Sequence, residues 1–143
     1  MSNIFEKLVG GKISKICRVC DMISIEIVFE RVEPIYIHVQ SFLRILDHQK
    51  IIVCSEDIYR CSEKHHAQDF CWDIPGQSVF DEVLKEYIDI LSSASILNAY
   101  MEPPGDLIIC CSGDVCIQIL INSVTYEEKY RIFNNSREFV FNG

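Results

Sequence analysis

The stretch from Gly105 to Phe133 constrains the fold of this chain more than any other. It contains two short runs of strand-forming residues, at 107–111 and 115–121, with Ser112-Gly113-Asp114 between them. A loop of about three residues that contains glycine is typical of a β-hairpin. Aliphatic residues occupy every other position of the second run, so one face of the hairpin is apolar and has to be covered.

The cover that the chain offers is one amphipathic helix, predicted over about residues 78–92. Apolar residues recur there at steps of three and four and form one broad stripe: Val79, Phe80, Val83, Leu84, Tyr87, Ile88 and Leu91. Ser78 is a favourable N-cap residue, and Asp81 three positions later resembles the acid of a capping box. Asp81 and Glu82 also suit the positive end of the helix dipole.

Alternation of apolar and polar residues in the first half of the chain predicts half-buried antiparallel strands. These strands are expected at residues 12–20, 23–30, 35–40, 42–46 and 51–54, and a last one is expected at 127–133. A short apolar patch at 139–141 either pairs on an edge or stays unpaired. The sequence therefore predicts one α+β domain over residues 1–143, a curved and mostly antiparallel sheet of about six to eight strands with one main helix packed on it.

Residues 55–75 interrupt this pattern. They are polar, charged and aromatic without periodicity, and they include His65, His66 and Trp72. A connection of this length is unusual in a compact domain and is often functional. The sequence assigns it no role.

The formal charge is −8 at pH 7, from 13 basic and 21 acidic residues. Such a surface repels nucleic acids and anionic membranes and attracts basic partners, although acidity that serves solubility alone is the alternative. Acidic residues gather on the expected outer face of the helix and in the adjoining loop. The candidate partner-binding residues are Glu82, Glu86, Asp89, Glu63, Asp69 and Asp73, with a simply solvated surface as the other interpretation.

The first ten residues lack an export signal, and no apolar run approaches the ~18 residues that span a bilayer. We therefore expect a cytoplasmic protein whose eight cysteines are thiols. Most of them lie in strand-like runs, where cysteine acts as a small buried hydrophobe. Those residues are Cys17, Cys54, Cys110, Cys111 and Cys116.

Two arrangements of thiols and imidazoles are candidate sites. Cys17 and Cys20, with Cys61 and His65 or with Cys71, could hold zinc, but the spacing between the two halves matches no known finger. A nucleophile and base could also be assembled in the irregular stretch, although neighbours in a polar loop are more often solvated. The residues concerned are Cys61, His65, His66 and Asp69. We expect no metal, no cofactor and no enzymatic activity.

Three segments carry a resemblance to a known class of protein. GDLII at 105–109, GDVCIQI at 113–119 and SVTYEEKYRI at 123–132 resemble the ending of small bacterial immunity-type proteins, including those of contact-dependent growth inhibition and of polymorphic toxin systems. Phe5, Leu8, Gly10 and Ile13 also fit the pattern. The resemblance is loose over about residues 47–74, and Lys129-Tyr130 stands where a tryptophan often precedes the arginine.

The resemblance implies a protein that binds a cognate toxin domain and blocks its active site or docking surface. Toxins of this kind are frequently basic nucleases, which suits an acidic inhibitor. It implies no catalytic or contact residue for this chain. The alternatives are a cytosolic zinc- or thiol-based regulatory protein that uses Cys17, Cys20, Cys61 and His65, and a structural module that self-associates through an apolar surface.

Overall fold

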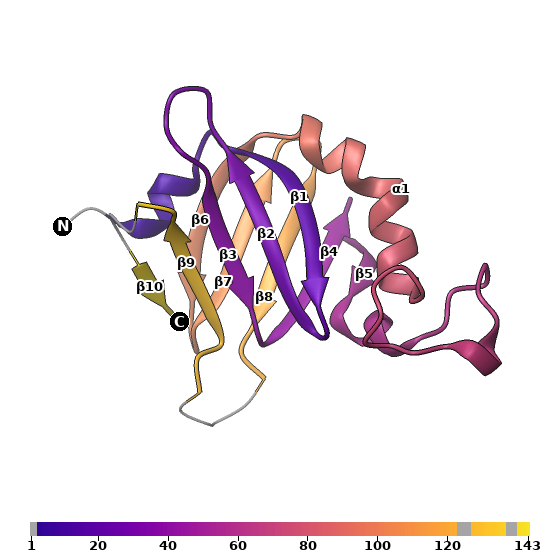
Figure 1. The fold of residues 1–143 in the computed structure, drawn as a ribbon. Coiled ribbons are helices and arrows are strands. Elements are labelled where there is room, and N and C mark those ends of the chain that lie inside the picture. The colour runs from indigo at the N-terminus through magenta and orange to yellow at the C-terminus, as the bar shows by residue number, and fades with distance from the viewer. Residues whose placement is uncertain (1–2, 123–126, 137–139) are drawn as a thin grey trace.

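The computed structural model describes residues 3–122, 127–136 and 140–143, which form an α+β domain (Figure 1). Within these residues the strands are β1 (Lys12–Val19), β2 (Met22–Val28), β3 (Ile35–Val39), β4 (Phe42–Asp47), β5 (Lys50–Cys54), β6 (Ile96–Glu102), β7 (Asp106–Cys111), β8 (Val115–Leu120), β9 (Tyr130–Asn134) and β10 (Val140–Asn142). The helices are α1 (Val79–Ser93) and three 3-10 helices, η1 (Ile4–Leu8), η2 (Ser55–Tyr59) and η3 (Ala67–Asp69).

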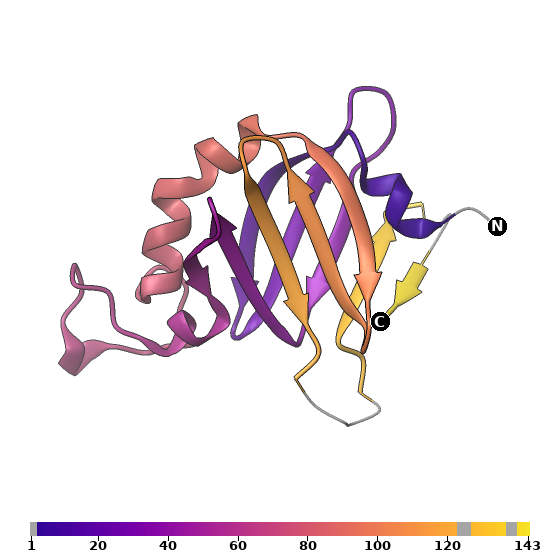
Figure 2. The same cartoon turned by 180° about the vertical axis from the view of Figure 1, so that it is seen from behind.

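The strands form two antiparallel sheets that lie face to face (Figure 2). Sheet A has the order β1-β2-β3-β9-β10, and sheet B has the order β5-β4-β8-β7-β6. Gln40 and Ser41 carry the chain from one sheet to the other, and both of their amides donate to the carbonyl oxygen of Lys129. The predicted α+β class, the antiparallel pairing and the single main helix are confirmed, and the strands are divided between two layers.

The core lies between the two sheets. Ile23, Ile25 and Ile27 of β2 are fully buried on one side, and Ile117 and Ile119 of β8 are fully buried on the other. The apolar face of the β7–β8 hairpin is therefore covered mainly by the other sheet, so the expectation that α1 supplies its cover was wrong. Residues 123–126, which are part of the segment that led to the family resemblance, lie outside the described residues, as does residue 139, the first of the apolar patch.

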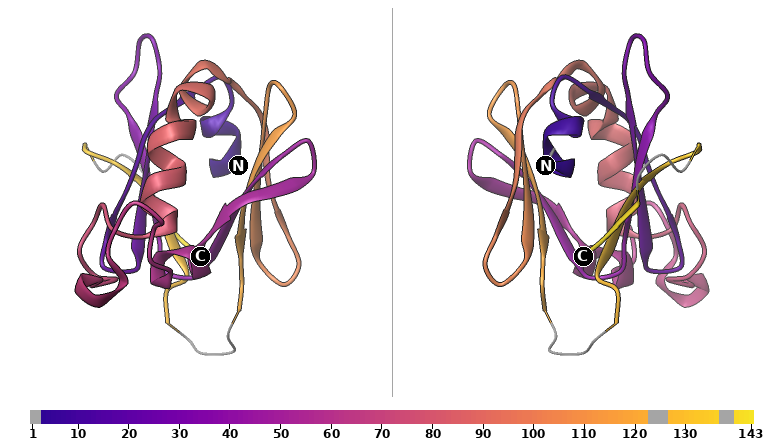
Figure 3. Two further views of the ribbon diagram at one scale, coloured as in Figure 1. Left: turned by 90° about the vertical axis from the view of Figure 1, so that its right-hand side faces the viewer. Right: turned by 90° about the vertical axis from the view of Figure 1, so that its left-hand side faces the viewer.

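The helix closes one open side of this sandwich. It packs along β1, the edge strand of sheet A, and also contacts β5 and η2 (Figure 3). The predicted N-cap is confirmed: Ser78 accepts from the amide of Asp81, and the Asp81 carboxylate accepts from the amide of Ser78. Phe80, Leu84 and Leu91 are buried. At the opposite open side η1 packs against β6.

One irregularity in β1 determines which of its side chains face the core. The pairing of β1 with β2 shifts register between Ile13 and Lys15, as a β-bulge does. Beyond this shift the inward positions are Ile16 and Arg18, whereas unbroken alternation would have placed Cys17 inside. Cys17 is exposed, so its expected burial was wrong, and Arg18 is only 5% exposed.

Candidate interaction surface

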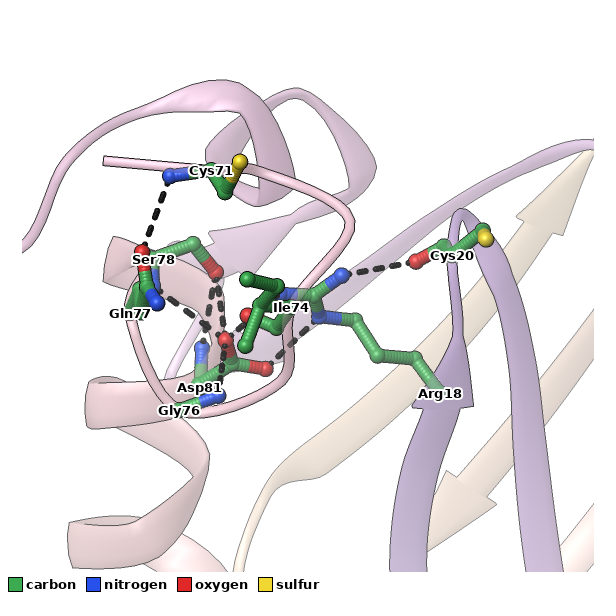
Figure 4. Close-up of polar contacts among 8 residues, drawn as sticks. All are labelled: Arg18, Cys20, Cys71, Ile74, Gly76, Gln77, Ser78 and Asp81. Carbon is green, nitrogen blue, oxygen red and sulfur yellow. Dashed lines mark hydrogen bonds and ion pairs between the residues drawn. The ribbon is translucent and has the colours of Figure 1, made fainter. Parts of the chain in front are cut away.

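The buried guanidinium of Arg18 is the anchor of the surface around the start of α1 (Figure 4). Its Nε lies 2.7 Å from Oδ1 of Asp81 and its Nη2 lies 2.7 Å from Oδ2, a bidentate pair. Nη1 donates to the carbonyl oxygen of Cys20 at 2.7 Å, and Nη2 also donates to that of Ile74 at 3.2 Å. One side chain of β1 thus binds the helix, the β1–β2 turn and the irregular loop.

The Asp81 carboxylate also accepts hydrogen bonds from the residues that precede the helix. Its Oδ2 accepts from the amide of Gly76 at 2.8 Å and from the hydroxyl of Ser78 at 2.9 Å. Burial raises the pKa of Asp81, but the hydrogen bonds from Arg18, Gly76 and Ser78 outweigh burial and lower it to about 2. Asp81 is therefore ionised near neutral pH and neutralises Arg18.

Further contacts hold the two ends of the irregular loop together. The amide of Val79 donates to the carbonyl of Arg60 at 2.8 Å, and the amide of Ser62 donates to that of Gln77 at 3.0 Å. Deeper in the loop, the amide of Cys71 donates to the side chain of Gln77 at 2.9 Å. Residues 55–75, which showed no periodicity, thus fold as an excursion with two 3-10 turns whose backbone is fixed at both ends.

Large apolar side chains are exposed on this fixed loop. Tyr59 is 45% exposed, Trp72 is 37% exposed and Ile74 is 48% exposed. The rings of Tyr59 and Trp72 are in contact, with their centroids 5.0 Å apart, and the Tyr59 hydroxyl donates to Asp21 at 3.0 Å. Exposed aromatic side chains on a rigid backbone are the residues that anchor protein interfaces.

Carboxylates surround these apolar side chains. Burial raises the pKa of Tyr59, and the carboxylates of Asp21 and Glu56 raise it further against the opposing charge of Arg18. We define the loop surface as the exposed side chains that come together here, with the acidic residue between Trp72 and Ile74. They are Asp21, Glu56, Tyr59, Trp72, Asp73 and Ile74.

A polar pocket of about 190 Å³ adjoins Tyr59. Asp21, Glu56 and Gln40 line it and supply oxygen acceptors. Ser41 also lines it, and the Ser41 hydroxyl is buried without a hydrogen-bond partner among the described residues. A pocket of this composition suits a cationic side chain better than an anionic one.

The acidic residues predicted to bind a partner separate into two groups. Glu82 accepts from the Ser62 hydroxyl and lies 3.3 Å from Nζ of Lys64, so it fastens the loop to the helix. Hydrogen bonds from Ser62 and Lys64 lower the pKa of Glu82. Glu86 is paired with the same lysine at 3.2 Å. The remaining four carry exposed carboxylates: Asp89, Glu63, Asp69 and Asp73.

The structure does not gather the predicted zinc ligands. Among the described residues no group of three or more His, Cys, Asp or Glu side chains could hold a metal ion. Cys17 and Cys20 are exposed at the end of β1. The Cys61 thiol points to the backbone oxygens of Ser62 and His65, at 3.4 and 3.5 Å.

The alternative catalytic cluster is not assembled in a reactive geometry either. Nε2 of His65 lies 3.5 Å from the backbone oxygen of Asp69 and not at its carboxylate. His66 and Asp69 are exposed at the two ends of η3. Among the described residues no hydrogen bond joins the Cys61 thiol to the ring of His65 or His66.

Sequence reasoning missed the residue that organises the site. Simple alternation places Arg18 on one face of an imperfect strand, and a bulge cannot be located from alternation alone. The available signal was a charged residue in an otherwise apolar run, between Cys17 and Val19. Tyr59 and Ile74 were also missed, since exposure in an irregular loop depends on how the loop folds.

No helix in the described part of the chain is long and apolar enough to cross a membrane. Comparison of the chain with models of protein families, with curated proteins and with solved structures finds no match.

Proposed function

We propose that this protein is an immunity-type inhibitor that binds a cognate toxin domain, of the class of basic nucleases, and blocks its active site or docking surface. The observation that carries the proposal is the loop surface, where Tyr59, Trp72 and Ile74 stand exposed on a backbone that the Arg18–Asp81 pair fixes. An ordered loop loses little conformational entropy on binding, which favours affinity.

Charge supports a basic partner. The chain carries a formal charge of −8, and three of its acidic residues, Asp21, Glu56 and Asp73, lie around the aromatic side chains of the loop surface. Opposite potentials accelerate encounter between two proteins by orders of magnitude at low salt. In the proposed complex the pocket beside Tyr59 receives a lysine or arginine of the toxin, which gives Ser41 and Glu56 a donor.

The helix supplies the second part of the proposed interface. Glu86 and Asp89 are exposed on α1. Glu82 contributes indirectly, because its contacts with Ser62 and Lys64 hold the loop beside the helix. The proposed contact area therefore extends from the loop surface along the outer face of α1.

Growth rescue tests the proposal. The toxin candidate to test is the C-terminal domain of any large exoprotein that is encoded beside the gene for this chain. Co-expression of this chain should restore growth of cells that produce the domain, and the two purified proteins should form a complex in isothermal titration calorimetry. A toxic neighbouring domain that this chain neither binds nor neutralises would contradict the proposal.

A matched pair of variants locates the interface. Trp72→Ala removes an exposed side chain of the loop surface, whereas Leu97→Ala removes one from β6, where Leu97 is 61% exposed. The first should weaken rescue and the second should leave it unchanged. Equal behaviour of the two variants would place the interface elsewhere.

A further inference from the structure

Two cysteines of sheet B face each other directly. Cys110 of β7 is the register partner of Cys116 of β8, and the hairpin that joins them turns at residues 112–114. Both thiols are free and partly exposed. Neither belongs to the loop surface, so this pair is independent of the proposed inhibitory function.

The register shows which kind of cross-strand pair this is. The amide of His48 donates to the carbonyl of Asp114 at 2.9 Å, and two residues further along the same ladder Leu46 pairs with Cys116. Because backbone groups alternate in direction along a strand, the peptide groups of Cys116 point to β4 and away from β7.

Cys110 and Cys116 consequently form a non-hydrogen-bonded pair, in which the side chains approach most closely. Opposite Cα atoms at such a pair lie about 4.5 Å apart. Disulfides span Cα separations of about 4.4–6.8 Å. The backbone of the hairpin therefore already has a spacing that a disulfide can bridge.

The side chains point to the accessible side of the sheet. Their sequence neighbours Ile109, Cys111 and Ile117 are buried in the core, so Cys110 and Cys116 face outward. Cys110 is also one of the groups that raise the pKa of the Cys116 thiol. A small reagent can approach them from solvent without opening the core.

We propose that Cys110 and Cys116 are a reversible oxidation site, at which a small disulfide such as oxidised glutathione converts the two thiols into a cross-strand disulfide. One cysteine, as the thiolate, attacks the S–S bond of oxidised glutathione, forms a mixed disulfide and releases the first glutathione. The other cysteine gives up its proton and attacks the protein sulfur of the mixed disulfide, which releases the second glutathione. Two protein thiols are oxidised, and one oxidised glutathione is reduced to two thiols.

The pKa of the Cys116 thiol affects how fast this pair exchanges with a disulfide. Burial and the neighbouring Cys110 raise the pKa of Cys116 to about 11, and the charge of Arg44 only partly offsets this. Since the thiolate is the nucleophile, attack by Cys116 is slow near pH 7 and accelerates as the pH rises.

Differential alkylation tests the proposal on the full-length chain. The protein is incubated with oxidised glutathione at pH 8, its remaining thiols are alkylated, and the peptides are analysed by mass spectrometry. The expected product is a Cys110–Cys116 bond, recognised by the loss of two hydrogen atoms and of two alkylation sites. Reduction with dithiothreitol should restore both sites.

Single substitutions separate this pair from its neighbour. Cys110→Ser and Cys116→Ser should each abolish the internal bond and leave the other cysteine reduced or carrying one glutathione. Cys111→Ser should retain the bond, because Cys111 faces the core. A glutathione adduct on Cys110 or Cys116 of the unmodified chain without an internal bond would overturn the proposal. So would thiols at this pair that stay unreacted after prolonged incubation at pH 8, long after exposed Cys17 has reacted.

Discussion

Arg18 and Asp81 are 63 residues apart in the chain and form a bidentate ion pair with both N–O distances at 2.7 Å. The Arg18 side chain is 1% exposed and the Asp81 side chain is 14% exposed. The pair joins an edge strand to the first turn of the helix that lies against it. It also holds the backbone of Ile74, and with it the loop surface.

Removing one partner of this pair should destabilise the fold strongly. Asp81→Ala leaves the Arg18 guanidinium buried without its counter-charge, a change that costs about 3–5 kcal/mol in comparable buried pairs. Urea denaturation followed by circular dichroism measures the free energy of unfolding. Asp89→Ala, at an exposed position of the same helix, should change it by less than about 0.5 kcal/mol. Similar free energies of unfolding for the two variants would show that the Arg18–Asp81 pair contributes nothing to stability.

Because of this pair, the free energy of unfolding should depend on pH in the acidic range. The folded pKa of Asp81 is lowered from 3.8 to about 2, so its contribution to stability is complete above pH 4 and is lost as the pH falls toward 2. The free energies of unfolding of the natural protein and of Asp81→Asn should therefore converge between pH 4 and pH 2. Urea titrations at pH 5, 3.5 and 2.5 measure this, and a constant difference would refute the assignment.

Leu84 is the position of α1 where a polar substitution should be most damaging. It is 5% exposed and faces β1, so Leu84→Asp buries a charge without a partner. We expect a loss of more than about 3 kcal/mol, seen as a large fall in melting temperature or as insoluble protein. Ile90→Asp is the control, because Ile90 is 48% exposed on the same helix. A fully folded Leu84→Asp protein would contradict the packing of α1.

Trp72 should act as an anchor of the proposed interface. Loss of an aromatic anchor typically costs about 2 kcal/mol or more, which corresponds to about a 30-fold rise in Kd for the toxin domain. Calorimetric titration of Trp72→Ala measures the change, and its melting temperature should remain close to that of the natural protein. Unaltered affinity would exclude the loop surface from the complex.

Charge reversal on the helix should slow association. Glu86→Lys with Asp89→Lys should lower the association rate about tenfold at low salt and less at high salt, since steering is screened. Glu82 is left intact because it fastens the loop through Ser62. The control places the same two reversals at exposed Glu30 and Glu102, elsewhere on the domain. Equal slowing by both pairs would show that only net charge matters.

Local signals in the sequence predicted the local elements well. Alternation between Val115 and Ile119 indicated the buried face of β8, and Ser78 with Asp81 indicated the start of α1. These features depend on neighbouring residues, whose spacing can be read directly. The division into two sheets depends on pairs such as β3 with β9, where Ile37 lies opposite Ile132, and no local pattern specifies such a pair.

The candidate site was less accessible to prediction for the same reason. Trp72 was noted in the irregular loop, but its contact with Tyr59 depends on a backbone fixed by Arg18, Asp81 and Gln77. Glu82 was predicted to bind a partner because it is acidic and lies on the helix, but in the structure its carboxylate accepts a hydrogen bond from Ser62. Composition can identify an acidic patch, whereas the fold decides which of its members remain available.

The place of β9 in sheet A has a consequence for how the domain is made. β9 supplies the neighbour of β3, so the first three strands keep an unpaired edge until residues 130–134 have been synthesised. A chain that ends before residue 130 would expose that apolar edge to other chains, and open strand edges promote aggregation. Translation that stops before residue 130 should therefore yield insoluble fragments, and productive folding must wait until β9 has left the ribosome.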